Sequence, residues 1–344
     1  MNTLRIVHLL DDFAMGGVSQ AISIYQTPEL REIADSRVLD VNPDSLLAPK
    51  LGDADVIVTH FPPRWKCLPF LLSLRARNRG ARLIHVEHSY TGAWEAHNVP
   101  NLKRFRLMMR SCYAIFDEII CVSFGQMNWL REAAHLPSGK LRVISPWSSH
   151  QGLNSLPVAD WRTDRPLVVG AYGRFANAKG FDTLIEAFNT LDPKRYILHL
   201  GGCGPEEPRL RQLAAGHENI RFMGTIRDVA GFLRECDVVA MPSRWEAYGL
   251  VATEARLAGR PILAANVDGL PEQVGAAGRV VDFTQPFRFA ETLFALTPCI
   301  VREMGEAARL SLSTAFEDRV HAWRDLFLPE TSDDKPGGET APVY

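Results

Sequence analysis

Short apolar runs recur along the whole chain, and the segments between them show the period of helices. A short apolar run predicts a strand that is buried on both faces, as in a parallel sheet. Strands that alternate with helices at this spacing predict doubly wound α/β domains. We expect strands at residues 4–10, 56–60, 82–88, 119–123 and 141–145 of the first half and at 167–172, 196–201, 220–223, 238–241 and 261–265 of the second.

The pattern breaks at two places. Between Pro146 and Pro166 the chain is rich in Ser, Asn, Gln, Trp and Pro without a clear period, which is typical of an interdomain linker. Residues 331–344 are rich in Asp, Pro and Gly, so we expect a disordered tail there. The sequence therefore predicts two Rossmann-like domains and a final helical segment, at residues 1–150, 166–310 and 311–330.

Composition narrows the function classes. The chain has 344 residues, of which 46% are hydrophobic and 23% charged, and a net charge of −2. These values are ordinary for about two globular domains and give no positive field that would attract nucleic acid. The six cysteines include no C-x-x-C pair, which argues against a zinc site and for the reduced thiols of a cytoplasmic protein. We expect neither a signal peptide nor a membrane-spanning helix, because no apolar run reaches ~18 residues.

The clearest chemical signal follows the expected strand at 238–241. Pro242 takes the chain out of the sheet, Gly249 opens an apolar-periodic helix, and Gly259 ends that helix. Ligands of open α/β sheets bind at such strand ends. The N–H groups at a helix start have no partner within the helix, so this place suits a diphosphate.

Two carboxylates flank this expected anion site. Glu246 lies in the loop, and Glu254 lies about one turn inside the helix. Carboxylates bind anions poorly, but they accept hydrogen bonds well from the hydroxyl groups of a sugar or a ribose. The alternative is that Glu246 is an ordinary surface residue and that Glu254 pairs with Arg256 or Arg260.

Two basic residues follow the expected strand at 167–172. Arg174 and Lys179 lie five residues apart in a loop that ends at a helix start. Both can reach one diphosphate, the arginine as a planar fork and the lysine as a point charge. The alternative is an ordinary surface turn.

These segments together resemble the retaining glycosyltransferases of family four, which have the GT-B fold of two Rossmann-like domains facing a central cleft. The resemblance rests on E-x-Y-G-L-V-x-x-E-A with G-x-P after it, and on G-R-x-x-x-x-K-G. It implies that Arg174 and Lys179 neutralise the donor phosphates and the leaving group. Glu246 would then orient the sugar, and Glu254 would bind the ribose. The other donor-binding residues in these motifs are Gly173, Tyr248, Gly249, Leu250 and Val251.

The resemblance extends to other loops of the chain. Gly16 and Gly17 resemble the Gly-Gly loop that approaches the donor phosphate or the acceptor, although a plain tight turn would also use glycine. Ile226 and Arg227 occupy the place where the family holds the nucleobase. His88 lies where the family often has a histidine that touches the donor sugar.

Three other positions, His85, Asp268 and Glu272, lie near the expected site. We expect His85 on the same face of its strand as His88, although a lone histidine at a strand end is more often structural. The family usually has two glycines before Pro-Glu, and here Asp268 occupies the first place, which puts a close approach of the ligand in doubt. Glu272 either caps the helix that follows or holds a sugar.

In GT-B folds the last helix crosses back onto the first domain, and residues 311–330 suit that course.

Residues 101–116 predict a helix with one apolar and one basic face. Its basic residues are Lys103, Arg104, Arg106 and Arg110. Such a helix either belongs to the domain and keeps a solvated basic face, or lies on an anionic membrane surface. The second alternative would bring the protein to the cytoplasmic face of the inner membrane.

The resemblance as a whole predicts an enzyme that uses neither a metal nor a cofactor. It would move a hexose, with retention at the anomeric carbon, from a UDP- or GDP-sugar to a glycan or lipid-linked glycan, as in bacterial cell-surface polysaccharide synthesis. No metal is expected, because the two basic residues balance the phosphates and no carboxylate cluster has metal spacing. Two alternatives stay open: a nucleotide-sugar epimerase of the same fold, and a non-catalytic protein that binds sugar nucleotides.

Overall fold

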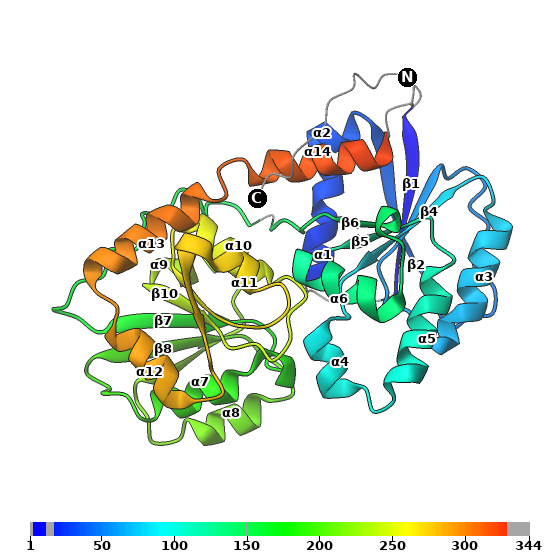
Figure 1. Cartoon of the computed structure of the whole chain (residues 1–344). Helices are drawn as coiled ribbons and strands as arrows, with labels where there is room; N and C mark the ends of the chain where they lie inside the picture. The colour runs from blue at the N-terminus through cyan, green and yellow to red at the C-terminus, as the bar shows by residue number, and fades with distance from the viewer. Residues whose placement is uncertain (1–2, 12–16, 149, 329–344) are drawn as a thin grey trace.

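The computed structural model describes residues 3–11, 17–148 and 150–328 (Figure 1). Within these ranges the chain forms two lobes, each built on a parallel sheet of six strands. The twelve strands include all ten that the apolar runs predict. The prediction of two doubly wound parallel-sheet domains is therefore confirmed, whereas the functional boundaries of the domains stay a prediction.

The first lobe holds the elements up to residue 143. Its strands are β1 (Leu4–Leu10), β2 (Ala34–Asp40), β3 (Val56–Thr59), β4 (Arg82–Glu87), β5 (Glu118–Cys121) and β6 (Leu141–Val143). Its α-helices are α1 (Gly17–Ile22), α2 (Pro28–Arg31), α3 (Leu68–Arg77), α4 (Gly92–Asn98), α5 (Leu102–Tyr113) and α6 (Phe124–Ala134). Short 3-10 helices connect them at Ser23–Gln26, Trp65–Cys67 and Ser138–Lys140.

The second lobe begins after the connecting segment 144–166. Its strands are β7 (Leu167–Tyr172), β8 (Tyr196–Gly201), β9 (Ile220–Gly224), β10 (Val238–Met241), β11 (Ile262–Ala265) and β12 (Gly278–Val281). Its α-helices are α7 (Phe181–Phe188), α8 (Glu207–Leu213), α9 (Val229–Arg234), α10 (Leu250–Leu257), α11 (Pro271–Val274), α12 (Pro286–Phe294) and α13 (Pro298–Leu310). Two 3-10 turns lie at Asn177–Lys179 and Gly275–Ala277, and the last helix is α14 (Ala315–Phe327).

The strand order puts a switch point in each lobe. The order is β2-β1-β3-β4-β5-β6 in the first lobe and β12-β11-β10-β7-β8-β9 in the second. Connections leave in opposite directions from β1 and β3, and likewise from β7 and β10. Ligands of doubly wound sheets bind in the crevice beyond the carboxyl ends of the strands at such a point.

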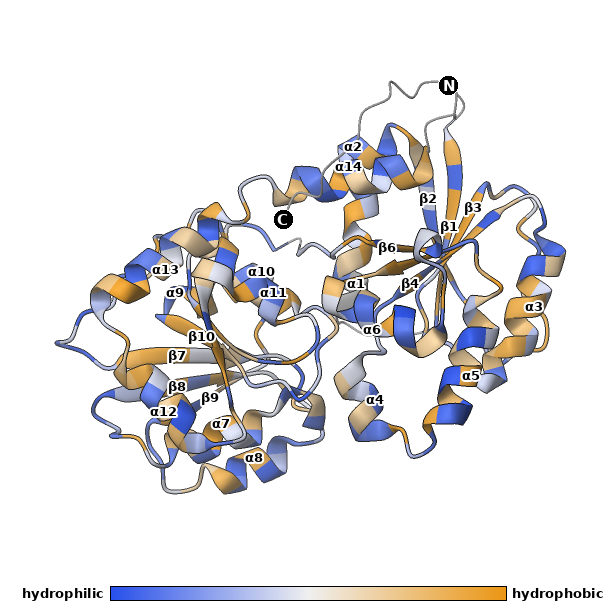
Figure 2. Cartoon of the chain, in the orientation of Figure 1, coloured by the Kyte–Doolittle hydropathy of each residue, from blue (hydrophilic) through white to orange (hydrophobic). Residues whose placement is uncertain are grey.

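Alternate strand residues in the first lobe face two separate cores. Val7 and Leu9 pack on one face of β1, whereas Ile6 and Leu10 pack on the other. This alternation follows from the period of two in a strand. Figure 2 shows by colour that the strands are mostly hydrophobic, while the outer helices carry mixed colours.

Helix α14 crosses from the second lobe back onto the first, where it lies beside α2 (Figure 1). The Trp323 ring meets the Tyr25 ring edge to face at a centroid distance of 4.9 Å. Leu326 and Phe327 are buried in the same core. The course expected for residues 311–330 therefore holds as far as Leu328, while the expected tail at 331–344 lies outside the described residues.

The two strands that the sequence pattern misses are both at sheet edges. β2 reads A-D-S-R-V-L-D and exposes Val38, and the short β12 exposes Val280. An edge strand is covered less completely, so its residues need not be apolar and no buried run marks it.

Two further observations concern the chain as a whole. Each helix in the described ranges is too short or too polar to cross a bilayer. All six cysteines are free thiols.

Candidate functional site

The start of α10 lies at the switch point of the second lobe and has no side-chain cap among the described residues. Gly249 precedes the helix with φ +90°. A Cβ at this glycine would come within 2.9 Å of both Leu270 and Met241, so both the space and the backbone conformation favour glycine. The N–H groups of the first turn therefore donate no hydrogen bond to a capping side chain, and this end of the helix carries partial positive charge.

The predicted acid and base lie together at this site. Lys179, after β7, forms an ion pair with Glu246, after β10, through Nζ and Oε2. The Ser243 hydroxyl donates to the same Glu246 oxygen over 3.2 Å. Both charged side chains are half-buried, so they pair in a place that a ligand can still reach. Arg174 is exposed, and no hydrogen bond or ion pair joins its side chain to another described residue.

Glu254 is enclosed rather than open to a ligand. It is 3% exposed, and its two carboxylate oxygens accept hydrogen bonds from Ser148 at 2.8 Å and Tyr172 at 2.6 Å. Burial raises the pKa of its carboxyl group, and the two hydroxyl donors oppose that rise. A ribose that binds here must therefore reach or replace one of these hydroxyls.

The alternative in which Glu254 pairs with Arg256 or Arg260 is wrong. Arg256 bonds to the Ser311 hydroxyl, with Nη2 at 2.7 Å, and Arg260 bonds to backbone carbonyl groups such as that of Leu233. Neither arginine approaches Glu254 closely enough to form an ion pair.

Tyr248 ties the loop before α10 to the crossing helix. Its hydroxyl accepts hydrogen bonds from Thr253 at 3.1 Å and from Arg319 of α14 at 2.8 Å. The side chain is buried, so Tyr248 supports the loop and can offer a ligand only its backbone. The next two residues pack in opposite directions: Leu250 lies against the core of the first lobe and Val251 against that of the second.

The remaining predicted donor residues are placed as follows. Ile226 packs directly beside Gly201: a Cβ atom added to this glycine would lie 2.5 Å from the Ile226 side chain. Arg227 is exposed. Gly173 has φ +145° directly after β7. Gly17 begins α1, and Gly16 lies outside the described residues. The roles expected for all of them stay predictions.

His88 is the last member of a line of three histidines. His8 Nδ1 lies 3.1 Å from His60 Nε2, and His60 Nδ1 lies 3.1 Å from His88 Nε2. The expectation that His85 shares the face of His88 is wrong. His85 bonds to Thr59 at 2.8 Å on the opposite face of β4, because an odd separation along a strand reverses the face.

Two acidic residues of the second lobe contact the first, and sequence reasoning missed this role. Asp268, with φ +45°, accepts hydrogen bonds from the Thr91 hydroxyl at 2.7 Å and the Ala93 N–H at 2.9 Å, at the start of α4. Its carboxylate also accepts the N–H of Glu246 at 3.0 Å. The Asp in place of the usual glycine was the available signal, and it marks a contact between the lobes.

Glu272 does not cap the helix that follows it, and its expected role in holding a sugar stays a prediction. Its carboxylate accepts the N–H groups of Phe124 at 3.0 Å and Gly125 at 3.2 Å. It therefore caps α6 of the first lobe and not its own helix. The helix start at α6 is thus occupied by the protein, in contrast to the one at α10.

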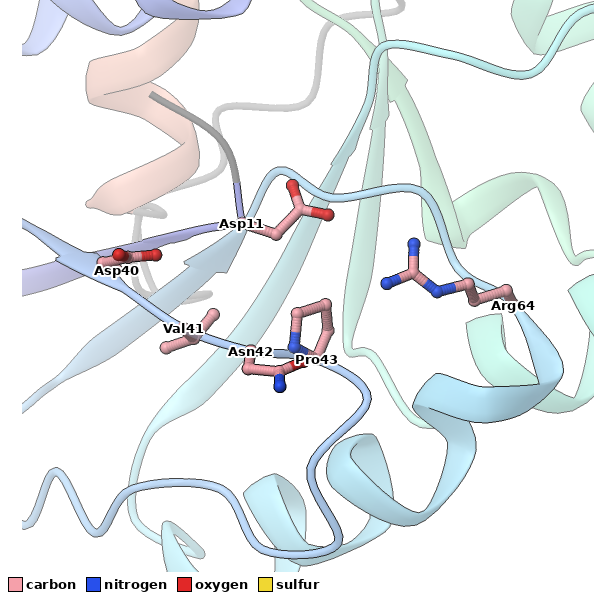
Figure 3. A pocket seen from close by; sticks show the side chains of 6 residues that line it. All are labelled: Asp11, Asp40, Val41, Asn42, Pro43 and Arg64. Carbon is pink, nitrogen blue, oxygen red and sulfur yellow. The ribbon is translucent and has the colours of Figure 1, made fainter. Parts of the chain in front are cut away.

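A polar pocket of about 350 Å³ opens on the first lobe. Its lining residues are Asp11, Asp40, Val41, Asn42, Pro43 and Arg64. Figure 3 shows the guanidinium of Arg64 directed toward the side of Asp11. The ends of β1 and β2 meet here, so the pocket lies at the carboxyl edge of the first sheet. No sequence motif marks this pocket, since its residues come from three separate segments.

Comparisons with known proteins match both lobes. Residues 34–147 match the family model "Glycosyltransferase Family 4", and residues 166–297 match "Glycosyl transferases group 1". A GDP-mannose-dependent monoacylated alpha-(1-6)-phosphatidylinositol monomannoside mannosyltransferase of Corynebacterium glutamicum is 33% identical over 263 residues, which is 70% of this chain and 68% of that protein.

Other curated relatives match over shorter segments. An uncharacterized 41.2 kDa protein in the cps region of Klebsiella pneumoniae is 32% identical over 161 residues, or 45% of this chain and 44% of the relative. A D-inositol 3-phosphate glycosyltransferase of Xylanimonas cellulosilytica is 34% identical over 170 residues, or 46% of this chain and 40% of the relative. The match thus spans less than half the length of each of these two proteins.

Solved structures resemble the whole fold. HepE of Anabaena, in complex with UDP and glucose, superposes with a TM-score of 0.75 at 17% identity, over 95% of this chain and 100% of that one. Sucrose-phosphate synthase of Thermosynechococcus elongatus gives 0.73 at 20% identity, over 94% and 98% of the two chains. At these identities the likeness is one of fold.

Proposed function

The chain belongs to glycosyltransferase family 4 and has the GT-B fold, and from that premise we propose that it transfers a hexose from a UDP- or GDP-sugar to a glycan or lipid-linked glycan. Retention at the anomeric carbon is part of the proposal. The single observation that carries it is the Lys179–Glu246 pair beside the uncapped start of α10. These groups provide one anion site and one hydroxyl acceptor at the carboxyl edge of the same sheet.

The chemical difficulty of such a transfer is the departure of a diphosphate while positive charge develops on the sugar ring. We assign stabilisation of the leaving group to the N–H groups at the start of α10, to Lys179 and to Arg174. The exposed Arg174 has the length to turn onto a bound phosphate. No residue acts as a covalent nucleophile in this proposal, because the family's retention is usually explained by same-face attack assisted by the departing phosphate.

The rest of the donor has candidate partners around this centre. Glu246, already close to the positive groups, would accept hydroxyls of the sugar, and His88 would contact the sugar from the first lobe. Glu254 would bind the ribose in exchange for one of its present hydroxyl partners. Ile226 and Arg227 would hold the base at the end of β9.

The acceptor would lie on the first lobe, in or near the pocket beside Asp11 and Arg64. The cps-region relative supports a role in polysaccharide synthesis. Both nucleotides stay in the proposal, because the mannosyltransferase relative is named GDP-mannose-dependent and HepE is in complex with UDP.

Helix α5 supports a further part of the proposal, namely contact with the cytoplasmic face of the inner membrane. Met108, Met109 and Cys112 anchor α5 in the lobe, so it is a domain helix. Its outer side exposes Leu102 by 46% and Leu107 by 54%. These residues are flanked by exposed basic residues, namely Lys103, Arg104 and Arg110. This combination suits an anionic bilayer surface.

The experiment that tests the function joins binding and turnover. Thermal unfolding would be followed with UDP, GDP, ADP and NAD, each at millimolar concentration. A ligand at a hundred times its Kd stabilises the native state by about 2.7 kcal/mol. We expect UDP or GDP alone to give a shift, followed by glycoside formation when the matching sugar nucleotide and a glycan acceptor are supplied.

The same experiment separates the two alternatives. An epimerase would release an isomerised nucleotide sugar or free sugar without any acceptor. A non-catalytic binding protein would show the thermal shift and no product. A shift with NAD, or with none of the four ligands, would contradict the donor site.

A further inference from the structure

Three neighbouring strands bring His8, His60 and His88 into one line. His8 lies within β1, and the other two histidines directly follow β3 and β4. The sheet order places β1, β3 and β4 side by side. Each link joins an Nδ1 to an Nε2 over 3.1 Å. His8 and His60 are buried, while His88, at the carboxyl edge of the sheet, is partly exposed.

All three imidazole rings are neutral at pH 7. Burial lowers the pKa of His8 to about 3 and that of His88 to about 4. Burial also lowers the pKa of His60 far below its ordinary value, and the neighbouring histidines add to this effect. A neutral imidazole carries one N–H and one bare nitrogen. Each link therefore has one donor and one acceptor. Because each ring has only one N–H, both hydrogen bonds must be donated in the same direction along the line.

The buried end at His8 decides that direction. His8 Nε2 is fully buried and has no hydrogen-bond partner among the described residues. If this atom carried the proton, a buried N–H donor would be orphaned, which native structures largely avoid. The proton therefore belongs on His8 Nδ1, which donates to His60 Nε2. His60 Nδ1 in turn donates to His88 Nε2.

We propose that His8 and His60 are positioning residues that hold His88 as a neutral ring with its proton on Nδ1, as a hydrogen-bond donor toward the sugar nucleotide. The tautomer follows from the geometry of the line, whereas the nature of the ligand rests on the proposed function. An Nδ1–H at this place can donate to a sugar hydroxyl or to a phosphate oxygen. His88 then orients the donor and transfers no proton.

The line also resists a second proton on His88. A charged His88 would carry a proton on Nε2, so both links would have to reverse and His8 Nε2 would become an orphaned donor. The other titratable groups that face the line are Glu87, His85 and Tyr25. Glu87 opposes the fall in the pKa of His88, His85 adds to it, and the Tyr25 ring stacks on His8 at 4.2 Å. Protonation of His88 would therefore leave a buried donor without an acceptor at His8.

The test reads the tautomer directly by nuclear magnetic resonance of the protein with ¹⁵N-labelled histidine. Spectra of His8→Gln, His60→Gln and His88→Gln assign the three rings. At pH 7 we expect all three to be neutral with the proton on Nδ1. A proton on Nε2 of His88 would overturn the proposal, whatever the enzyme does.

Two substitutions of His60 separate positioning from packing. His60→Leu removes the donor to His88, so His88 is expected to populate both tautomers. His60→Asn carries an amide N–H near the position of Nδ1 and is expected to restore the Nδ1–H form. His199→Leu is the matched control, because His199 is a buried histidine of the second lobe without a hydrogen-bond partner among the described residues. It should leave His88 unchanged.

Kinetics and binding complete the test. In His60→Leu, kcat/KM for the sugar nucleotide is expected to fall about tenfold, the scale of one net hydrogen bond, and His60→Asn should recover most of it. Affinity for the nucleoside diphosphate without the sugar should not change if His88 contacts the sugar. An unchanged tautomer in His60→Leu would overturn the proposal. If the native protein binds no sugar nucleotide, the proposed function fails, while the tautomer experiment still decides the state of His88.

Discussion

The carbonyl oxygen of Asp268 lies directly against Gly125, where any Cβ atom would overlap it. This contact joins the loop after β11 to the first turn of α6, so the backbones of the two lobes touch. The Asp268 carboxylate extends the contact to the start of α4, and Glu272 extends it to the N–H groups of α6. The structure is thus a closed arrangement of the lobes.

Gly125→Ala should prevent this closure without harming the fold. Gly125 is not in the left-handed region, and alanine in a helix is favoured over glycine by about 1 kcal/mol. We expect an unchanged or higher melting temperature, retained binding of the nucleotide, and a transfer rate lowered at least about tenfold. Gly80→Ala is the control, because a Cβ there would contact nothing within 4 Å. Full activity of Gly125→Ala would show that closure is not needed for transfer.

Asp268→Asn should loosen the same contact by a different route. Asparagine tolerates a positive φ, so the backbone at this position is not strained further. The bonds from Thr91 and Ala93 lose their charged acceptor, and each such bond contributes roughly 1.5–3 kcal/mol. Small-angle X-ray scattering should report a larger radius of gyration than for the native chain. An identical scattering profile would mean that other contacts hold the lobes together.

Lys179→Met and Glu246→Gln should each abolish transfer. Removal of one group that stabilises developing charge typically costs about 10²–10³-fold in kcat. Each single change leaves a half-buried charge without its partner, so both variants should also melt at a lower temperature. The double variant should regain stability but not activity, and Lys194→Met is the exposed control. Near-native activity in either single variant would contradict the assigned site.

Glu254→Gln should change stability and binding in opposite directions. Folding raises the pKa of this carboxyl, so its contribution to stability is greatest below the pKa of the unfolded chain and declines as the pH rises through the folded pKa. The glutamine variant lacks this decline, so its advantage in the free energy of urea unfolding should grow as the pH rises above the ordinary carboxyl pKa of about 4.5. Its affinity for the nucleoside diphosphate should fall about tenfold, as expected for one lost ribose contact. Equal pH profiles of the two proteins would contradict a buried carboxylate at Glu254.

Leu102→Ser together with Leu107→Ser should weaken binding to anionic vesicles. The native protein is expected to float with vesicles that contain phosphatidylglycerol at low salt and to be released at high salt, because screening removes the contribution of the basic residues. The control is Leu310→Ser, a leucine on the second lobe that is even more exposed than the other two. Failure of the native protein to float would exclude the membrane contact.

The sequence predicted what depends on neighbours along the chain. Apolar runs located ten strands, and the loops after two of these strands located Lys179, Glu246 and the start of α10. It could not predict which side chains meet across the two lobes. The capping of α6 by Glu272 depends on the angle between the sheets, which no local pattern encodes. The line from His8 to His88 depends on the order of three strands. Its only local signal is that each histidine lies in or directly after an expected strand.

The bond from Arg319 to Tyr248 has a consequence for the synthesis of the protein. Domains generally fold from the N-terminus as the chain leaves the ribosome. α14 emerges after every other described element, yet it buries the Tyr25 face of the first sheet and holds the loop before α10. Both lobes can thus form early, while the loop that would carry the donor gains its last support only when α14 has docked. The nascent chain is therefore expected to become able to bind the donor only in a late step, after both sheets have folded.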